Sequence, residues 1–524
     1  MLLIACFANG CGKRARTSGQ PEGLAPAVEL GTTIGSLAEV ATPELIAVEG
    51  YGLVGGLNGT GSAECPPRIR EYLKQYILTQ LPEHKLDTEE FINSPDTAVV
   101  LVDGMIAAEA VKNQNFDVRV SALPGTQTTS LEDGWLYKAE LHVRGTFGIS
   151  TKVLANAEGP IFIDKSDTTN QNSRLGYILA GGRSLEDFRI NLLFHRQDYR
   201  VASQVRNLLD ERFGYGTAKA VSPSRIELKV PAKYKEQKPR FISIVKAMYL
   251  DNRPEFIEER VKMFVRELAV SENKYESEIA LEAVGNASLS KLPILLNSSD
   301  GQVRLQAARC MLNLGGDRGF QALREMALDS SSAYRLEALE AITMSANRND
   351  AAALSQKLLR DEDFDIRIAA YEQLRKLNDI AITQRYVARS FYLEQIVQAE
   401  RPAIFVSRSG QPRIVLFGAP IRCRENIFVQ SADGSITIDA PPGQKYVSII
   451  YKHPRRLDVI LKLESSFELV DIILKLCEEP LKKDKQARHG LGVSYAEMIA
   501  FLKQMCDKGA VDAQFRAGPL PKIG

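Results

Sequence analysis

The chain has 524 residues, of which 44% are apolar and 25% charged, a composition of folded globular domains that excludes disordered chains and multi-span membrane proteins. Its 66 basic and 65 acidic residues nearly cancel, which argues against a dedicated nucleic-acid binder, because such a protein needs a broad positive field. A single hydrophobic core stops growing at roughly 250 to 300 residues, so we expect about three or four domains.

The first residues, MLLIACFANGC, combine a short apolar run with small residues before Cys11. This is similar to the end of a lipoprotein export signal, in which the cysteine is lipidated after cleavage. A basic n-region is missing and the apolar run is short, so either the true start lies upstream or the segment is a frayed apolar terminus. For residues 1–33 we expect an export segment, with Cys11 as the candidate lipidation site, followed by a flexible tether.

Residues 34–150 mix helical and strand patterns. The stretch RIREYLKQYILTQL has the apolar spacing of a helix. In NFDVRVSAL, apolar residues alternate with polar ones, which predicts a strand with one face in a core. These signals predict a first mixed α+β domain.

Residues 151–255 have the same mixed character. FRINLLFH and RIELKVPA are predicted strands on either side of the predicted helix YRVASQVRNLLDERF. Gly214 follows this helix and is suited to end it, because glycine accepts the left-handed conformation without steric cost. These residues predict a second mixed α+β domain.

A repeat follows. The pattern Arg-x-x-Ala recurs at spacings of 31 and 32 residues, starting at Arg304, Arg335 and Arg367. Four positions before each arginine stands a residue whose side-chain oxygen can cap a helix: Asp300, Ser331 and Asp363. The period is similar to that of HEAT-type repeats, which are helix pairs stacked into a solenoid. We therefore expect an all-α HEAT-like solenoid at 256–398.

The last part of the chain predicts a small β-rich segment at 399–460, in which SADGS is a hairpin turn, and a helical segment at 461–524. One predicted helix of this tail presents a single apolar face and ends at Gly509. The face consists of Met498, Phe501, Leu502 and Met505. The whole chain is thus predicted to be a multidomain α+β protein with two mixed domains, the solenoid, the β-rich segment and the helical tail.

A glycine-rich stretch raises the question of cofactor binding. Gly50 to Gly55 satisfy G-x-G-x-x-G, but the glycines that continue to Gly61 are a run that no helix would favour. No Lys-Ser/Thr follows to make a P-loop. A backbone turn that allows close main-chain approach is therefore favoured over a dinucleotide site.

The other chemical signals are weak. Residues 361–372 have carboxylates at calcium-loop spacing, but Ile366 occupies the position that requires glycine. The seven cysteines include no C-x-x-C pair, and they leave a disulfide among the later ones open. The five histidines are isolated and no nucleophile motif occurs. Two short basic patches, 451–456 and 482–485, are expected to be solvated, with contact to an anionic cell-wall polymer or lipid as the alternative. We predict no enzyme, no cofactor and no metal.

Four stretches, taken together and in order, resemble the flagellar P-ring protein family. The first is GYGLVGGLNGTG, in which Gly55 stands where that family usually carries a larger apolar residue. The others are NFDVRVSAL, the strand-helix-strand unit from INLLFH to RIELKVP, and LGVSYAEMIAFLKQMCDKGAVDA. The resemblance covers about 35–250 and 401–515, which implies that the helical repeats are inserted into a P-ring-like protein.

The resemblance implies a structural, non-enzymatic, exported protein. Such a protein assembles with copies of itself into a ring around the flagellar rod in the periplasm, beside peptidoglycan and the outer-membrane ring. A closed ring needs heterologous interfaces, and the glycine-rich stretch would be a backbone turn at a subunit or rod contact. The residues expected in this assembly motif are Gly50, Tyr51, Gly52, Gly55, Gly56, Asn58, Gly59 and Gly61.

Two alternatives remain. The export-like segment and the repeats would also suit a lipid-anchored cell-envelope scaffold that binds an unknown protein through its HEAT-like face. A cofactor-dependent enzyme is the third and most remote hypothesis. We expect no nucleic-acid partner.

Overall fold

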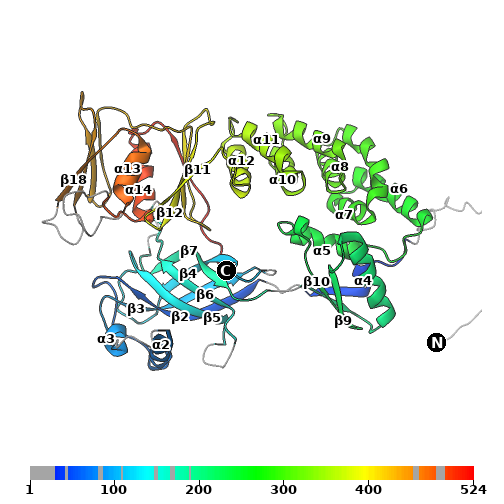
Figure 1. Ribbon diagram of the computed structural model, residues 1–524, viewed down its shortest axis with the longest axis horizontal. Coiled ribbons are helices and arrows are strands. Elements are labelled where there is room, and N and C mark those ends of the chain that lie inside the picture. The colour runs from blue at the N-terminus through cyan, green and yellow to red at the C-terminus, as the bar shows by residue number, and fades with distance from the viewer. Residues whose placement is uncertain are drawn as a thin grey trace, which may run out of the picture.

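The computed structural model describes residues 30–41, 45–80, 87–107, 110–146, 152–165, 172–187, 190–452, 460–478 and 490–523. Figure 1 shows four bodies arranged as a closed circuit. They are a barrel (46–184), a small domain (30–41 with 190–250), a helical segment (254–376) and a C-terminal domain (383–518). The fold is α+β and multidomain, as the sequence predicts.

Six antiparallel strands close the barrel in the order β2-β3-β4-β7-β6-β5. Their bounds are β2 (Ile46–Gly55), β3 (Ala98–Ile106), β4 (Asn115–Ala122), β5 (Trp135–Val143), β6 (Ala155–Pro160) and β7 (Leu175–Ser184). In β4 the alternate residues Val118, Val120 and Ala122 are buried in the barrel core, as the alternating pattern predicts. Helices α2 (Pro67–Gln80) and α3 (Thr88–Ile92) pack outside, against Leu53 and Val99.

The small domain is a four-stranded antiparallel sheet with helices on one face. The strand order is β1 (Ala38–Ala41), β8 (Ile190–Phe194), β10 (Arg225–Leu228) and β9 (Ala218–Ser222). The covering helices are α1 (Ile34–Leu37), α4 (Tyr199–Phe213) and α5 (Lys238–Ala247), with a 3-10 turn η1 (Ala232–Tyr234). Asp198 caps α4 and Gly214 ends it with a φ of 104°, which confirms the predicted helix end.

The observed bodies do not divide at residue 150, where the sequence predicted a domain boundary. Strands β6 and β7, which lie beyond that residue, hydrogen-bond to β5 and β4 and close the barrel. Residues 38–41 pair with β8 in the small domain, although they precede the barrel in the chain. The domain boundaries are set by pairing between strands that are far apart in the sequence. Local residue patterns do not reveal which strands will pair, so they could not predict these boundaries.

The helical segment consists of consecutive helices in which α6 packs against α7 and α8 against α9. Their bounds are α6 (Pro254–Val270), α7 (Lys274–Val284), α8 (Gly301–Asn313), α9 (Asp317–Leu328), α10 (Arg335–Ser345), α11 (Arg348–Leu358) and α12 (Phe364–Lys376), with 3-10 turns η2 (Asn286–Ser290) and η3 (Leu292–Asn297). The helices end at Lys376 and strand β11 begins at Thr383, so residues 383–396, which the sequence assigned to the solenoid, form strands of the next sheet. The HEAT-type assignment stays a prediction.

Two of the three predicted caps are present. Asp300 and Asp363 accept the backbone N–H groups of Gln302 and Asp365. Ser331 caps no helix, because α10 starts with Tyr334 as its N-cap residue and the Ser331 hydroxyl donates to Asp329 instead. A competing side-chain bond within the preceding loop therefore replaces the predicted cap.

The C-terminal domain places two helices between two sheets (Figure 1). One sheet has the order β11 (Thr383–Val387), β12 (Phe391–Ile396), β14 (Arg413–Phe417), β13 (Ala403–Val406) and β19 (Gln514–Ala517). The other has β15 (Ile427–Gln430), β16 (Ile436–Ala440), β17 (Val447–Lys452) and β18 (Ile460–Ser465). The predicted SADGS turn joins β15 to β16, with Gly434 at a φ of 74°.

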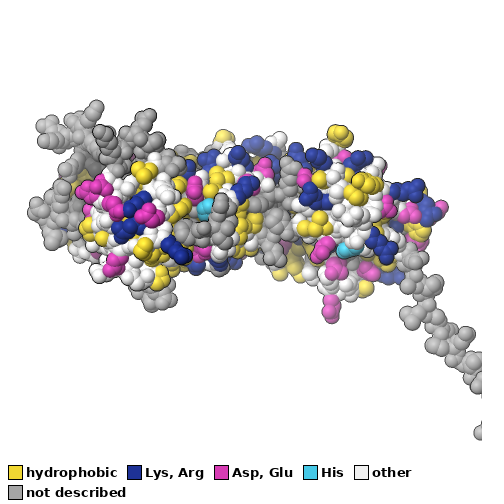
Figure 2. Space-filling view, turned by 90° about the horizontal axis from the view of Figure 1, so that it is seen from below, with side chains coloured by type: hydrophobic (Ala, Val, Ile, Leu, Met, Phe, Trp, Pro, Cys, Tyr) yellow, Lys and Arg dark blue, Asp and Glu magenta, His cyan; other side chains and the backbone are white. Residues whose placement is uncertain are grey.

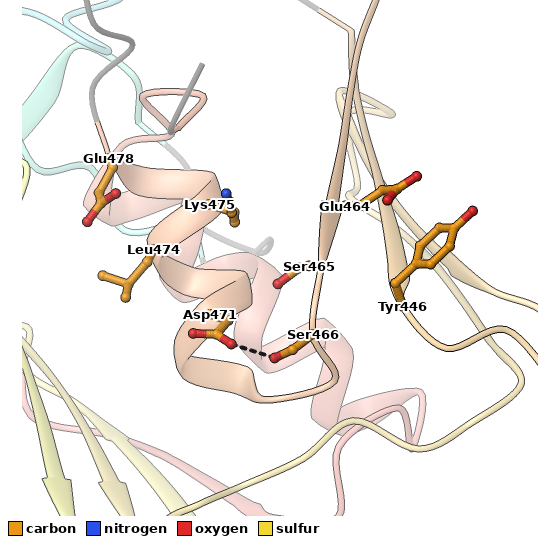
Figure 3. Close-up of a pocket in the computed structure, with 8 residues that line it drawn as sticks. All are labelled: Tyr446, Glu464, Ser465, Ser466, Asp471, Leu474, Lys475 and Glu478. Atoms are coloured by element: carbon orange, nitrogen blue, oxygen red, sulfur yellow. Dashed lines mark hydrogen bonds between the residues drawn. The ribbon is translucent and has the colours of Figure 1, made fainter. Parts of the chain in front are cut away.

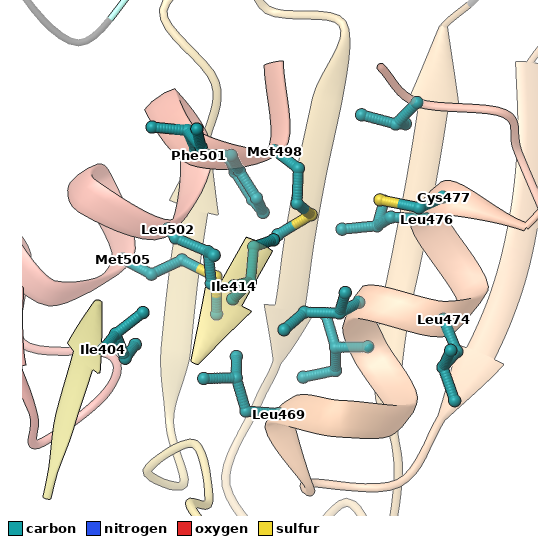
Figure 4. Close-up of a cluster of buried hydrophobic side chains, with 14 of the residues drawn as sticks. Ile404, Ile414, Leu469, Leu474, Leu476, Cys477, Met498, Phe501, Leu502 and Met505 are labelled. Atoms are coloured by element: carbon teal, nitrogen blue, oxygen red, sulfur yellow. The ribbon is translucent and has the colours of Figure 1, made fainter. Parts of the chain in front are cut away.

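The core of this domain is built on the predicted apolar face of the tail. Helices α13 (Leu469–Cys477) and α14 (Tyr495–Asp507) pack between the sheets, and Figure 4 shows Met498, Phe501, Leu502 and Met505 of α14 beside Ile404 and Ile414. These four side chains are at most 1% exposed. The opposite face of β13 and β14 packs on α12 through Val415 and Phe417, so these two central strands of the five-stranded sheet are buried on both faces.

Candidate functional site

The first half of the glycine-rich motif is a strand, which corrects the predicted turn. Gly50, Tyr51, Gly52 and Gly55 lie in β2, where the first three pair with β3 and Gly55 pairs with Trp135 of β5. The next helix, α2, begins only at Pro67. The strand, tight turn and helix of a dinucleotide site are therefore not formed by these residues.

These glycines allow close approach within the barrel. The pairing of β2 with β5 is irregular between Glu49 and Val54. A Cβ on Gly50 would lie 2.0 Å from the carbonyl oxygen of Glu140, and one on Gly52 would lie 2.8 Å from a methyl carbon of Leu136. We call this line of contact between β2 and β5 the seam; it closes the barrel because its glycines lack side chains.

Gly55 makes room for an aromatic ring. A Cβ there would lie 2.7 Å from a ring carbon of Tyr137, which is itself 43% exposed on the outer face of β5. The same ring packs against Phe91 of α3, with centroids 5.5 Å apart. Tyr137 thus occupies the space that a larger residue at position 55 would fill.

The second half of the motif is the predicted turn. Gly56, Asn58 and Gly59 all have positive φ, and the Asn58 side chain donates to the Gly56 carbonyl at 2.6 Å. The turn is fixed at its end, because the Gly61 N–H donates to the Pro95 carbonyl at 2.9 Å and a Cβ on Gly61 would lie 2.1 Å from the Thr97 carbonyl oxygen. A Cβ on Gly59 would meet no atom within 4 Å, and one on Gly56 would meet only the Asp133 carbonyl oxygen at 3.8 Å. At both positions the positive φ, and not a neighbouring atom, therefore favours glycine.

Cys11, the candidate lipidation site, lies outside the described residues. Within the described ranges, none of the helices combines the length and the apolar character that crossing a bilayer requires.

Charged groups join the barrel to the C-terminal domain. Asp117 of β4 accepts the backbone N–H of Gly410 at 2.9 Å and that of Ala180 at 2.7 Å. Arg408 donates to Asp164 at 2.6 Å, in a site where both side chains are mostly buried. The sequence pattern did not identify Asp117, since it is one of several polar positions in an alternating strand and its partner is 293 residues away.

A buried ionic cluster joins the small domain to the helical segment. Arg240 of α5 donates to Glu278 at 2.5 Å and to Glu282 at 2.9 Å, and both glutamates of α7 are fully buried. Burial by itself lowers the pKa of Arg240, but the two carboxylates more than offset this and raise it above its usual value. Arg309 of α8 bonds Glu278 as well, at 2.7 Å.

A third polar cluster joins the helical segment to the C-terminal domain. The hydroxyl of Tyr371 and the guanidinium of Arg375, both on α12, donate to the buried carboxylate of Glu394 on β12 at 2.5 and 2.9 Å. Arg413 of β14 donates to Glu372 of α12 at 2.7 Å. The three clusters therefore fix three of the four junctions of the circuit, and the chain itself links the barrel to the small domain at the fourth.

Two other features could suggest a ligand site. Glu132, Asp133 and Glu497 bring carboxylate oxygens within 4.8 Å of one another, but the ammonium of Lys165 forms ion pairs with Glu132 and Glu497 and supplies the positive charge there. This group is a further ionic contact between the barrel and α14.

A groove of about 420 Å³ runs between β18 and α13. Figure 3 shows Glu464 and Tyr446 on one side and Asp471 and Glu478 on the helix, with the Ser466 hydroxyl donating to Asp471 at 2.5 Å. These groups are spread along the groove and do not converge on one point. Over the face in Figure 2, acidic and basic side chains are likewise interspersed, in keeping with the balanced charge.

Comparison with known proteins finds similarity to one family in the part of the chain that forms the barrel and the small domain. The family model for the flagellar P-ring protein matches residues 33–265, which contain the barrel and the small domain. The flagellar P-ring protein of Thermotoga maritima is 30% identical over 212 residues, covering 37% of this chain and 60% of the relative. That of Anaeromyxobacter dehalogenans strain 2CP-C is 26% identical over 324 residues, covering 58% of this chain and 80% of the relative. The chain thus spans three fifths of the Thermotoga protein's length.

Proposed function

We propose, from the premise that the chain belongs through residues 33–265 to the flagellar P-ring protein family, that it is a structural, non-enzymatic subunit of the basal-body P-ring. The main support for this proposal is that the family match includes both the barrel, with its seam, and the small domain, whose strands β1 and β8 lie before and after the barrel in the chain. Ring assembly from copies of this chain, around the rod in the periplasm, follows from that role. The outer-membrane ring and peptidoglycan are the neighbours we propose for it.

The arrangement of the molecule supports a load-bearing role. Three polar clusters connect the four bodies, and each includes at least one mostly or fully buried charge. Buried ion pairs fix geometry, because separating them leaves an uncompensated charge. A subunit held in one shape suits a ring that surrounds a rotating rod.

A deletion strain tests this function. We expect cells without the chain to lose motility and their isolated basal bodies to lack the ring at the P-ring position in electron micrographs. Reintroducing the intact gene should restore both. Cells that swim normally and carry complete basal bodies would contradict the proposal and favour the scaffold alternative.

For the glycine-rich motif we propose a narrower assembly role. The glycines of the seam are explained by contacts inside the barrel, so only the turn at Asn58 and Gly59 is left as a candidate contact with a neighbouring subunit or the rod. Gly59→Asp should reduce ring assembly while the purified chain keeps its fold by circular dichroism, because aspartate tolerates a positive φ better than a β-branched residue. Gly52→Val is the contrasting variant, because it should damage the barrel itself. Normal rings with Gly59→Asp would leave the turn without an assembly role.

The helical segment extends beyond the matched residues, and grooves on it could bind another protein. One lies between α10 and α12, where Leu336 is 42% exposed beside Thr343 and Ala369. We propose that a protein partner of the helical segment binds in this groove. The Leu336→Asp variant of the full chain should no longer bind that partner, whereas the Leu336→Met variant should still bind it. If both variants bind the partner equally well, the groove is not the binding site.

A further inference from the structure

The sheet of the small domain ends in two open edges. Its strand order places β1 at one edge and β9 at the other, and among the described residues no further strand adjoins either. Because the sheet has four antiparallel strands, its two edge strands run in opposite directions. An open edge presents main-chain donors and acceptors that can pair with another chain.

The backbone pattern identifies the groups at each edge. The His195 N–H donates to the Leu37 carbonyl, so in this ladder residues 39 and 41 face β8, and Ala38 and Val40 face outward. The Lys229 N–H donates to the Thr217 carbonyl, so by the same alternation Ala218 and Ala220 face away from β10.

Internal bonds decide which outward groups can pair. The Ala38 N–H donates to the Ile34 carbonyl, and the Ala218 N–H donates to the Asp210 carboxylate. Val40 on β1 and Ala220 on β9 are therefore the residues whose outward N–H and C=O can meet those of another chain. Paired with each other in the antiparallel sense, they exchange two hydrogen bonds.

Charge favours pairing between unlike edges. Glu39 of β1 and Lys219 of β9 are both exposed on the solvent face of the sheet. If two β1 edges paired, Glu39 would lie near the Glu39 of the other copy, and if two β9 edges paired, Lys219 would lie near the other Lys219. Both pairings would be opposed by repulsion between like charges. If β1 pairs with β9, Glu39 and Lys219 become diagonal neighbours and attract each other. An interface between two different edges is heterologous, which is the kind that closes a ring.

We propose that neighbouring copies of this chain join by edge-to-edge pairing of β1 in one copy with β9 in the next, with Val40 opposite Ala220. This rests on the proposed ring function and names the surface through which the subunits meet. Strand β9 has a bulge at Val221, so the register is defined on its regular part, where Ala41 lies directly opposite Lys219 of the neighbour. This pair is not hydrogen-bonded, and side chains are closest at such a pair. The sheet of the small domain then continues from subunit to subunit.

Disulfide trapping tests the register in the full chain. Ala41 and Lys219 of one copy lie on opposite edges, three strand spacings or roughly 14 Å apart, beyond the reach of a disulfide. Cells that produce differently tagged Ala41→Cys and Lys219→Cys chains should, after oxidation with copper phenanthroline, yield a dimer containing both tags. Each variant alone should yield none, and neither should Ala41→Cys with Glu211→Cys, whose new cysteine is exposed on α4 on the other face of the sheet.

A second pair of variants tests the main-chain contact. Ala220→Pro removes the outward N–H but no bond to β10, so the chain should fold and fail to assemble; Ala220→Thr keeps the N–H and should assemble. Complete rings with Ala220→Pro, or cross-linking in a single variant alone, would overturn the junction. If rings form but the mixed dimer does not, the pairing of β1 with β9 is wrong and the proposed ring function still stands. If the chain stays monomeric and forms no rings in cells, both the pairing and the ring function are wrong.

Discussion

Gly50 illustrates how closely two strands of the barrel approach each other. Its missing side chain leaves room for the carbonyl oxygen of Glu140, a main-chain atom that cannot rotate away. Overpacking in a core costs about 1 to 3 kcal/mol when side chains can adjust. Where the neighbour is backbone, the adjustment must come from the strands themselves, so the cost lies at or above the upper end of that range.

Gly50→Ala is therefore expected to destabilise the barrel by about 3 kcal/mol. Native-state hydrogen exchange of the β2 and β5 amides measures this free energy locally. Gly59→Asn is the matched control, because open space surrounds Gly59 and asparagine tolerates a positive φ better than most residues, so the change should cost about 1 kcal/mol. Similar exchange in the two variants would show that the seam tolerates a side chain.

Cys423 gives a pH dependence at the scale of one residue. Burial, with a smaller contribution from Cys506, raises the pKa of its thiol from 9.0 to about 12. Because the folded pKa is the higher one, the stabilisation is complete below about pH 9 and is lost as the pH rises towards 12. We expect Cys423→Ala to lose less stability than the parent chain between pH 9 and 11 in urea titrations. If both chains lost the same free energy of unfolding over this pH range, burial would not raise the pKa of the Cys423 thiol in the folded protein.

Helix caps give a prediction at the scale of an element. Asp363 accepts the Asp365 N–H at 2.9 Å at the start of α12, whereas Ser331 caps no helix. Asp363→Ala should therefore cost about 1 kcal/mol and Ser331→Ala less than about 0.5. Hydrogen exchange in the first turns of α12 and α10 measures the two effects. A larger cost for Ser331→Ala would mean that the three repeats begin alike after all.

The elements that the sequence predicted correctly are those whose signal is local. The alternation in β4, the capped helix α4 and the apolar face of α14 all depend on neighbours within a few residues. The barrel could not be predicted, because its closure depends on β5 pairing with β2 across about 90 intervening positions. For the same reason the glycine motif was recognised as a place of close main-chain approach, while its first half was assigned to a turn instead of a strand.

At the scale of the whole molecule, the chain is a closed circuit of bodies. The barrel follows β1 and precedes β8, so it is covalently linked to the small domain at both ends, and the helical segment leads from the small domain to the C-terminal domain. Asp117 and Arg408 then complete the circuit by binding that domain to the barrel. A contact inside such a circuit forms at a high effective concentration, because the remaining contacts hold its partners near each other.

Opening the circuit at one contact should therefore weaken a distant one. Arg240→Ala leaves Glu278 and Glu282 buried with one fewer partner, a loss that typically costs about 3 to 5 kcal/mol and should free the small domain from the helical segment. The Gly410 amide, which Asp117 holds at the opposite side of the circuit, should then exchange its hydrogen faster, since that contact would depend on a looser tether. Arg253→Ala provides the control, because Arg253 is exposed and bonds Asp251 two residues away. If Gly410 keeps its protection in Arg240→Ala while the α5 and α7 amides lose theirs, the bodies are held pairwise and the circuit contributes no rigidity of its own.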